Sequence, residues 1–341
     1  MGDALTRKDE SRIKQLLIDA AKRGNSAVPE LLDALHSGNA ELSQLAGTAL
    51  AGIGTPDAVK ELLDHIRSLQ DPEARSAFTS VLKNIRNPEA VPTLTQALRD
   101  NPDNRLRLTL QVALGNSVTP EMLPSLLDHF FDEDVPDPYR RSIAQALASS
   151  SQTNVMTALR NWLGEQQDPR YASYISSALS YVGTFTSVNT LFDMAEQSGG
   201  GDLTPFRDAF RQLHNPDAVP ALSGRLQSAP SPDLFNLAVE GLAGVGNGDA
   251  AYSLLKYMVH TPDADRVQSI QDALGRMENP ETIPILLAAL HSDQTPREQG
   301  QVLLQVLAHF SDSQIIKTLG DVQAQPLLQV IHSFRPPNFS P

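Results

Sequence analysis

The stretch that decides the fold is residues 279–290, Asn-Pro-Glu-Thr-Ile-Pro-Ile-Leu-Leu-Ala-Ala-Leu. It begins with asparagine and proline, a favourable helix start because the amide side chain accepts from the first unpaired N–H groups. The apolar residues then recur at steps of three and four, which is the spacing of one face of an α-helix. They are Ile283, Leu286, Leu287 and Leu290. The segment therefore predicts a capped amphipathic helix.

The same pattern recurs about every 32 residues from one end of the chain to the other. Self-similarity at a period of this size is typical of stacked repeats, in which each unit buries its apolar face against its neighbours. The positions that head the pattern are Val28, Val59, Val91, Leu123, Val155, Val188, Val219, Ala251, Ile283 and Ile315.

A second amphipathic helix follows in each unit, and it often begins at a capping residue before proline, as at Asp71-Pro72 and Ser231-Pro232. No segment has the period-two alternation of a strand. Glycines near the ends of the second helices are predicted to close them in the left-handed conformation. These glycines are Gly52, Gly115, Gly183, Gly244 and Gly275. The first predicted helices cover residues 28–36, 57–68, 72–86, 89–99 and 104–115.

The expected fold is all-α, a right-handed α-α superhelix (α-solenoid) of about ten two-helix repeats. One domain is predicted over residues 1–333, with an N-terminal capping helix at about 10–25 whose polar face would keep the open end of the stack in water. Residues 334–341 contain three prolines and are predicted to form a tail or a linker.

The period also fits tetratricopeptide and ankyrin repeats, but the sequence patterns of those two families are absent. The stretches at 87–98, 215–222 and 279–290 resemble HEAT repeats, most of all the short variety of phycobilin-lyase-like HEAT proteins. The resemblance covers about residues 10–333 and implies the α-solenoid fold, with little information on activity. The units headed by Val155 and Val188 lack the proline of the first helix.

Composition narrows the function. The 40 acidic and 27 basic residues give a formal net charge of −13, which argues against binding to nucleic acid or to an anionic membrane. There is no cysteine, so disulfides and thiol nucleophiles are excluded. No apolar run is long enough to span a bilayer, and the first residues have no signal-peptide core. A cytoplasmic and a periplasmic location both remain compatible with these features.

Four arginines occupy matching positions early in the second helices, namely Arg75, Arg107, Arg140 and Arg207. One interpretation is a ladder of Asp–Arg pairs that joins neighbouring repeats. The other is a row of guanidinium groups on the concave face that binds the carboxylates of a partner. Two aromatic residues outside the apolar register, Tyr174 and Phe235, are predicted to lie on the same face, whereas Trp162 is predicted to lie in the core.

No combination of acid, base and nucleophile indicates catalysis, and no spacing indicates a metal or cofactor site. The expected function is a non-catalytic scaffold whose concave face binds another protein or a peptide. The alternative, implied by the resemblance, is a phycobilin-lyase-like protein that handles a chromophore or another ligand. A third possibility, excision of DNA bases by a HEAT-like glycosylase, is disfavoured by the acidic charge.

Overall fold

The computed structural model describes residues 19, 22–37, 39–100, 103–128, 130–166, 168–198, 201–229, 231–277, 279–292 and 297–335. Within these residues the chain forms 20 α-helices and several short 3-10 turns, with no strand. The all-α prediction is confirmed. Most of the predicted capping helix at 10–25 and the end of the predicted tail lie outside the described residues.

The contacts divide the chain into two compact units, residues 1–166 and 167–341, which are described separately. The prediction of one continuous domain stays a prediction. The first unit contains η1 (Gly24–Ala27), α2 (Val28–Leu35), α3 (Ala40–Ile53), α4 (Pro56–Ser68), α5 (Pro72–Lys83), η2 (Pro88–Ala90), α6 (Val91–Arg99), α7 (Asn104–Ser117), η3 (Pro120–Met122), α8 (Leu123–Leu127), α9 (Asp137–Ala148) and α10 (Thr153–Glu165).

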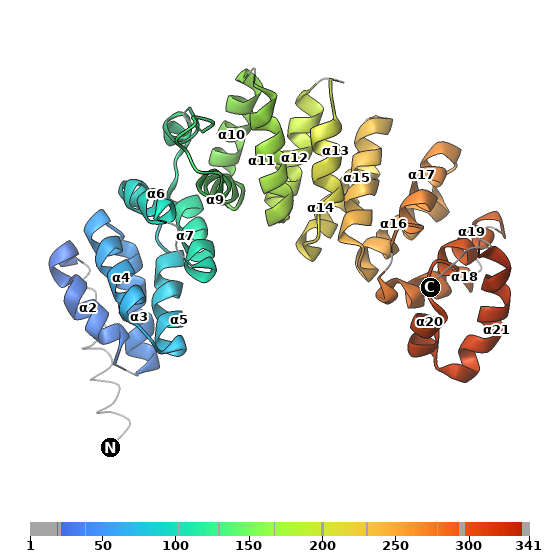
Figure 1. The fold of residues 1–341 in the computed structure, drawn as a ribbon, viewed down its shortest axis with the longest axis horizontal. Coiled ribbons are helices and arrows are strands. Elements are labelled where there is room, and N and C mark those ends of the chain that lie inside the picture. The colour runs from blue at the N-terminus through green and yellow to red at the C-terminus, as the bar shows by residue number, and fades with distance from the viewer. Residues whose placement is uncertain are drawn as a thin grey trace. The chain divides into compact units, whose positions relative to one another are not determined.

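The second unit continues the same alternation of helices (Figure 1). It contains α11 (Pro169–Val182), α12 (Phe185–Gln197), α13 (Thr204–Arg211), η4 (Pro216–Ala218), α14 (Val219–Ser228), α15 (Pro232–Val245), α16 (Gly248–His260), α17 (Ala264–Leu274), η5 (Pro280–Thr282), α18 (Ile283–Leu290), α19 (Arg297–Leu307), α20 (Asp312–Leu319), α21 (Asp321–Ile331) and η6 (His332–Phe334).

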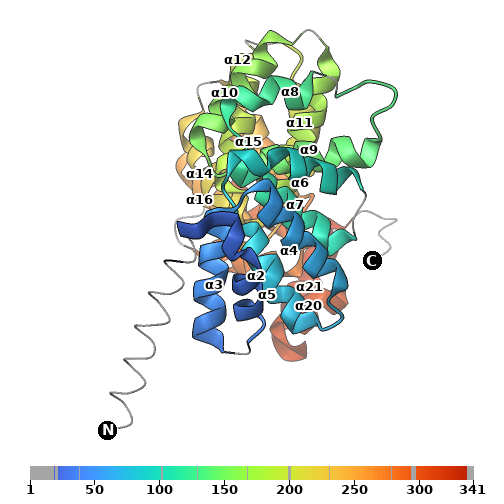
Figure 2. The same ribbon diagram turned by 90° about the vertical axis from the view of Figure 1, so that its left-hand side faces the viewer.

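Two layers of helices form each unit. The even-numbered helices are the first helix of each repeat, here called A helices, and the odd-numbered ones are the second, called B helices. In the first unit α3 packs on α5 (Figure 2), α5 on α7 and α7 on α9. In the second unit α11 packs on α13, α13 on α15 and α15 on α17, while α12, α14, α16 and α18 form the other layer. The surface made by the B helices of one unit is called its B-helix face.

The apolar stripes predicted from the sequence form the core. In α4, for example, every apolar residue of the stripe is buried, because this face of the helix packs against α5 and α6. The buried residues of that stripe are Val59, Leu62, Leu63 and Ile66. Burial of such side chains contributes about 1.5–3 kcal/mol each relative to exposure, so the repeating stripe accounts for the stacking.

Most predicted capping residues cap their helices. The side chain of Asp71 accepts from Glu73 N and Ala74 N, and that of Ser231 accepts from Leu234 N. The asparagine-proline starts of several A helices begin with a 3-10 turn that leads directly into the α-helix, as at Asn87 and Asn215. A single 3-10 turn at a helix start is common because it satisfies the first backbone groups within a tight loop.

The glycine prediction is correct at Gly183 alone, which has φ +59° and ends α11. In α3 and α15 the left-handed residue is instead Gly54 and Gly246, two residues later than predicted. Gly244 is helical, and a Cβ there would lie 2.8 Å from the carbonyl oxygens of Phe210 and Arg211. This glycine is therefore needed for the close approach of α15 to α13. Gly52, Gly115 and Gly275 likewise lack a left-handed φ.

Among the described residues, no helix is long and apolar enough to cross a bilayer.

Candidate functional site

The residues predicted to bind a partner lie on B helices, in two separate groups. Each of the four arginines lies four residues after the N-cap of its helix, on α5, α7 and α9 in the first unit and on α13 in the second. Tyr174 lies half-buried on α11, and Phe235 lies four residues after the N-cap of α15. All four arginines are half-buried at this position.

Arg75, one of the four matched arginines, pairs with an acid of the neighbouring repeat. The guanidinium of Arg75 on α5 lies 2.5 Å from the carboxylate of Asp103, the N-cap of α7. The pKa of Asp103 is lowered by the N–H of Leu106, which donates to it, and by Arg75, against a raising effect of burial. In the second unit Arg225 of α14 pairs with Asp193 of α12 at 2.5 Å. Arg75 therefore has a structural partner within the chain.

Arg140 holds the loop in front of its own helix. Its Nη2 donates to the carbonyl oxygen of Val135 at 2.6 Å, and its guanidinium lies 5.7 Å from the centre of the Phe131 ring. Arg107 donates to Asn104 in its own helix at 3.0 Å. In both residues the guanidinium is bound within the first unit, which weakens their assignment as partner contacts.

The prediction for Phe235 is wrong, because only 1% of this residue is exposed. Its ring packs at 5.3 Å from that of Tyr257, and the guanidinium of Arg266 lies 4.7 Å above it. The position is half-buried where arginine occupies it, since an arginine buries its stem and keeps its charge in water. A phenylalanine has no charge to keep in water, so the whole side chain enters the core.

Trp162 is also placed differently from the prediction. It is half-exposed, and the core positions of α10 are instead Val155, Met156, Leu159 and Leu163. In contrast, Phe192 and Phe210 are buried, with their ring centres 4.4 Å apart. Two other aromatic residues of the second unit are largely exposed, since Tyr181 is 64% and Phe185 is 56% exposed.

A groove of about 230 Å³ crosses three consecutive B helices of the second unit. Sequence reasoning placed only Arg207 of this groove in a functional role, because the other residues lie outside the matched position. Arg211 forms a two-bond ion pair with Glu240, in which Nη2 donates to Oε1 at 3.0 Å and Nε donates to Oε2. The groove is lined by Arg207 and Arg211 of α13, Asn236, Val239 and Glu240 of α15, Ser269 and Asp272 of α17, and Arg276.

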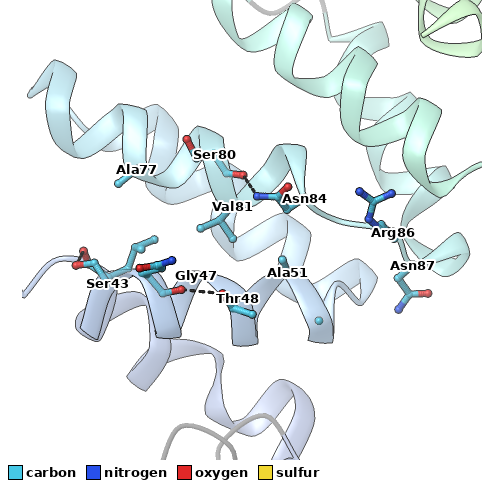
Figure 3. A pocket seen from close by; sticks show the side chains of 13 residues that line it. Ser43, Gly47, Thr48, Ala51, Ala77, Ser80, Val81, Asn84, Arg86 and Asn87 are labelled. Carbon is cyan, nitrogen blue, oxygen red and sulfur yellow. Dashed lines mark hydrogen bonds between the residues drawn. The ribbon is translucent and has the colours of Figure 1, made fainter. Parts of the chain in front are cut away.

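A larger groove, of about 770 Å³, lies between α3 and α5 in the first unit. Small residues make its walls, and Figure 3 shows Arg86 and Asn87 at one end with Ser43 and Ala77 toward the other. Some of its polar groups are hydrogen-bonded within the chain: Thr48 donates to Gln44 O at 2.9 Å, and Asn84 donates to Ser80 O at 3.0 Å. The walls therefore present mostly carbon atoms.

No motif in the sequence indicates the α3–α5 groove, because a groove forms where side chains are small rather than where they are reactive. A Cβ added at Gly52 would meet no atom within 4 Å, whereas one at Gly47 would lie 2.9 Å from Val81. Gly52 thus borders open space, and Gly47 allows α3 to approach α5.

A third cleft, of about 640 Å³, lies on the A-helix layer of the second unit between α14 and α16. Tyr252, Lys256 and His260 follow one another at helical spacing along α16, and Tyr257 closes one side. Among the described residues, no group of three His, Asp or Glu side chains is arranged to hold a metal ion.

Comparison with known proteins identifies the repeats. A family model described as HEAT repeats matches residues 28–115, 61–148 and 219–308. Human deoxyhypusine hydroxylase in complex with glycerol matches 81% of this chain and 98% of its own, at 19% identity and a TM-score of 0.26. A structure from the computational design of self-assembling cyclic homo-oligomers matches 96% of this chain and 100% of its own, at 10% identity and a TM-score of 0.17. The curated proteins contain no match.

Proposed function

The chain belongs to the HEAT-repeat family, and we propose that it is a non-catalytic scaffold that binds another protein or a peptide on its B-helix faces. A stacked-repeat protein offers long surfaces that no part of its own core occupies. The net charge of −13 favours a protein or peptide partner over nucleic acid or an anionic membrane.

The observation that carries the proposal is the α3–α5 groove. Its volume of about 770 Å³ is in the range of binding sites, and small side chains make most of its walls. A partner that enters it would bury carbon surface, which favours association.

The test fills the groove while keeping the fold. Gly52→Trp places an indole in the groove, and Gly224→Trp is the matched control, because a Cβ at either glycine meets no atom within 4 Å. Wild type and both variants are used for affinity capture from the native organism, with quantitative mass spectrometry. We expect partners that wild type and Gly224→Trp retain and Gly52→Trp loses. If wild type captures nothing above empty resin, the scaffold proposal is wrong.

A second candidate is the handling of a chromophore or another flat, acidic ligand, as the resemblance to phycobilin-lyase-like proteins implies. The specific observation in its favour is the cleft between α14 and α16, where Tyr252 and Tyr257 supply aromatic faces and Lys256 supplies a cation. Absorbance spectra after mixing with a bilin test it. A shifted spectrum that Tyr252→Ala abolishes supports this function, and an unchanged spectrum rules it out for the bilin used.

A further inference from the structure

The groove over α13, α15 and α17 contains more positive charge than its own acidic residues neutralise. Arg211 is neutralised by Glu240, since the two are joined by two hydrogen bonds. Asp272 accepts a hydrogen bond from Gln268 at 2.8 Å and keeps its charge. Arg207 and Arg276 then face a single carboxylate among the residues that line the groove.

Neither of these two arginines has a salt bridge or a side-chain hydrogen bond to another described residue. The one described electrostatic neighbour of Arg207 is Asp202, whose pKa it helps to lower after the larger effect of hydrogen bonds from Thr204. In a chain of net charge −13, a pair of such guanidinium groups is a local exception. Guanidinium groups bind carboxylates through two parallel N–H donors.

We infer that this groove binds an extended acidic peptide segment, with one carboxylate at Arg207 and a second at Arg276. The inference deepens the proposed function, because it rests on the protein being a peptide-binding scaffold and states the chemistry of the segment. Asn236 on the central helix α15 adds a neutral donor and acceptor between the two charged ends.

The spacing of the helices sets the spacing of the carboxylates. Packed helices lie about 8–10 Å apart, so α13 and α17, with α15 between them, are separated by about 16–20 Å. An extended peptide rises about 3.3 Å per residue, so this separation corresponds to acidic residues about five or six positions apart.

The experiment uses fluorescein-labelled peptides of glycine and serine that carry two glutamates five positions apart. A matched probe has glutamine at both positions, and binding to the full-length protein is followed by fluorescence anisotropy at low salt, where screening is weak. We expect the glutamate probe to bind about tenfold more tightly than the glutamine probe, as for charge-assisted hydrogen bonds at two positions. Equal binding of the two probes would overturn the inference.

Two double variants distinguish binding in the groove from the effect of the protein's overall charge. Arg207→Gln/Arg276→Gln should abolish the preference for glutamate. Lys60→Gln/Lys317→Gln removes the same charge from exposed lysines outside the groove and should keep the preference. If both double variants lose it equally, the effect is general electrostatics and the inference is wrong. Competition by inorganic phosphate at matched ionic strength should be no stronger than by chloride, and stronger competition would identify an anion site instead of a peptide site.

The outcomes also separate this inference from the proposed function. If the probes show no preference while the Gly52→Trp variant still loses native partners, the scaffold stands and the acidic-peptide inference fails. If the preference is found but wild type captures nothing from the native organism, the groove stands and the scaffold proposal fails.

Discussion

The side-chain amide of Asn215 donates to the carbonyl oxygen of Val182 across 2.8 Å, and so ties the start of the α14–α15 repeat to the end of α11. The oxygen of the same amide accepts from Asp217 N at 3.0 Å, which caps the turn that begins α14. In the first unit Asn87 makes the equivalent pair of bonds, to Ile53 O and from Glu89 N.

This link depends on glycine one repeat earlier. A Cβ at Gly183, which has φ +59°, would lie 2.7 Å from the Cβ of Asn215. A Cβ at Gly54, which has φ +46°, would lie 3.2 Å from that of Asn87. The left-handed glycine thus ends the helix and leaves room for the asparagine that binds its last carbonyl groups.

Asn215→Asp should destabilise the protein by about 1–2 kcal/mol, because the cap is kept while the donor to Val182 is lost. Asn247→Asp is the matched control: the oxygen of Asn247 also caps its helix, by accepting from Ala250 N, and an aspartate follows two residues later as it does after Asn215. Urea unfolding followed by circular dichroism measures both. An equal loss in the two variants would show that the link between repeats contributes nothing.

Two helical glycines should respond oppositely to alanine. Gly224→Ala meets no atom within 4 Å and should stabilise the protein by about 0.5–1 kcal/mol, because alanine restricts the unfolded chain. Gly244→Ala would press against the backbone of α13 and should destabilise by about 1–3 kcal/mol. Thermal unfolding of both variants checks the signs, and a stabilising Gly244→Ala would contradict the close packing of α15 on α13.

Leu163→Ala should destabilise the protein by about 2–5 kcal/mol, because Leu163 is 8% exposed and its loss leaves a cavity. Trp162→Ala should cost less, since Trp162 is half-exposed. Denaturant unfolding of the two variants side by side measures the difference. If Trp162→Ala were the more destabilising variant, the sequence-based prediction that Trp162 lies in the core of α10 would be correct.

The contrast between these two residues shows how far the sequence can predict the structure. The 32-residue period and the cap-proline pairs predicted the helices of most repeats to within a few residues, because periodicity and capping are local. In α10 no proline fixes the start, Gln152 makes no side-chain cap, and the core residue of the last turn is Leu163 instead of Trp162.

The candidate site was less predictable, because it depends on contacts between repeats. The matching register of Arg75, Arg140 and Phe235 is visible in the sequence, but their partners are not. Whether a side chain at that position pairs with the next repeat, holds a loop or enters the core depends on which residues the neighbouring helices supply. The grooves themselves arise where small residues such as Gly52 leave space, and no sequence pattern predicts such a position.

Acid should weaken the ion pair between Asp103 and Arg75. Its folded-state pKa is lowered, first by the N–H of Leu106 and also by Arg75, so its ionised form is favoured in the folded protein. The stabilisation is therefore present above the ordinary aspartate pKa of 3.8 and is lost as the pH falls through the lowered folded value. Asp103→Asn keeps an acceptor for Leu106 N but removes the charge that pairs with Arg75.

We expect Asp103→Asn to be less stable than wild type at neutral pH, by less than about 1 kcal/mol because the pair is partly exposed. The difference should shrink as the pH falls from about 5 to about 2, since both proteins then lack the charge. Asp233→Asn, in the first turn of α15 and exposed, is the control and should not change the slope. Urea unfolding across this pH series decides the matter, because a difference that is the same at every pH would show that the charge of Asp103 does not stabilise the fold.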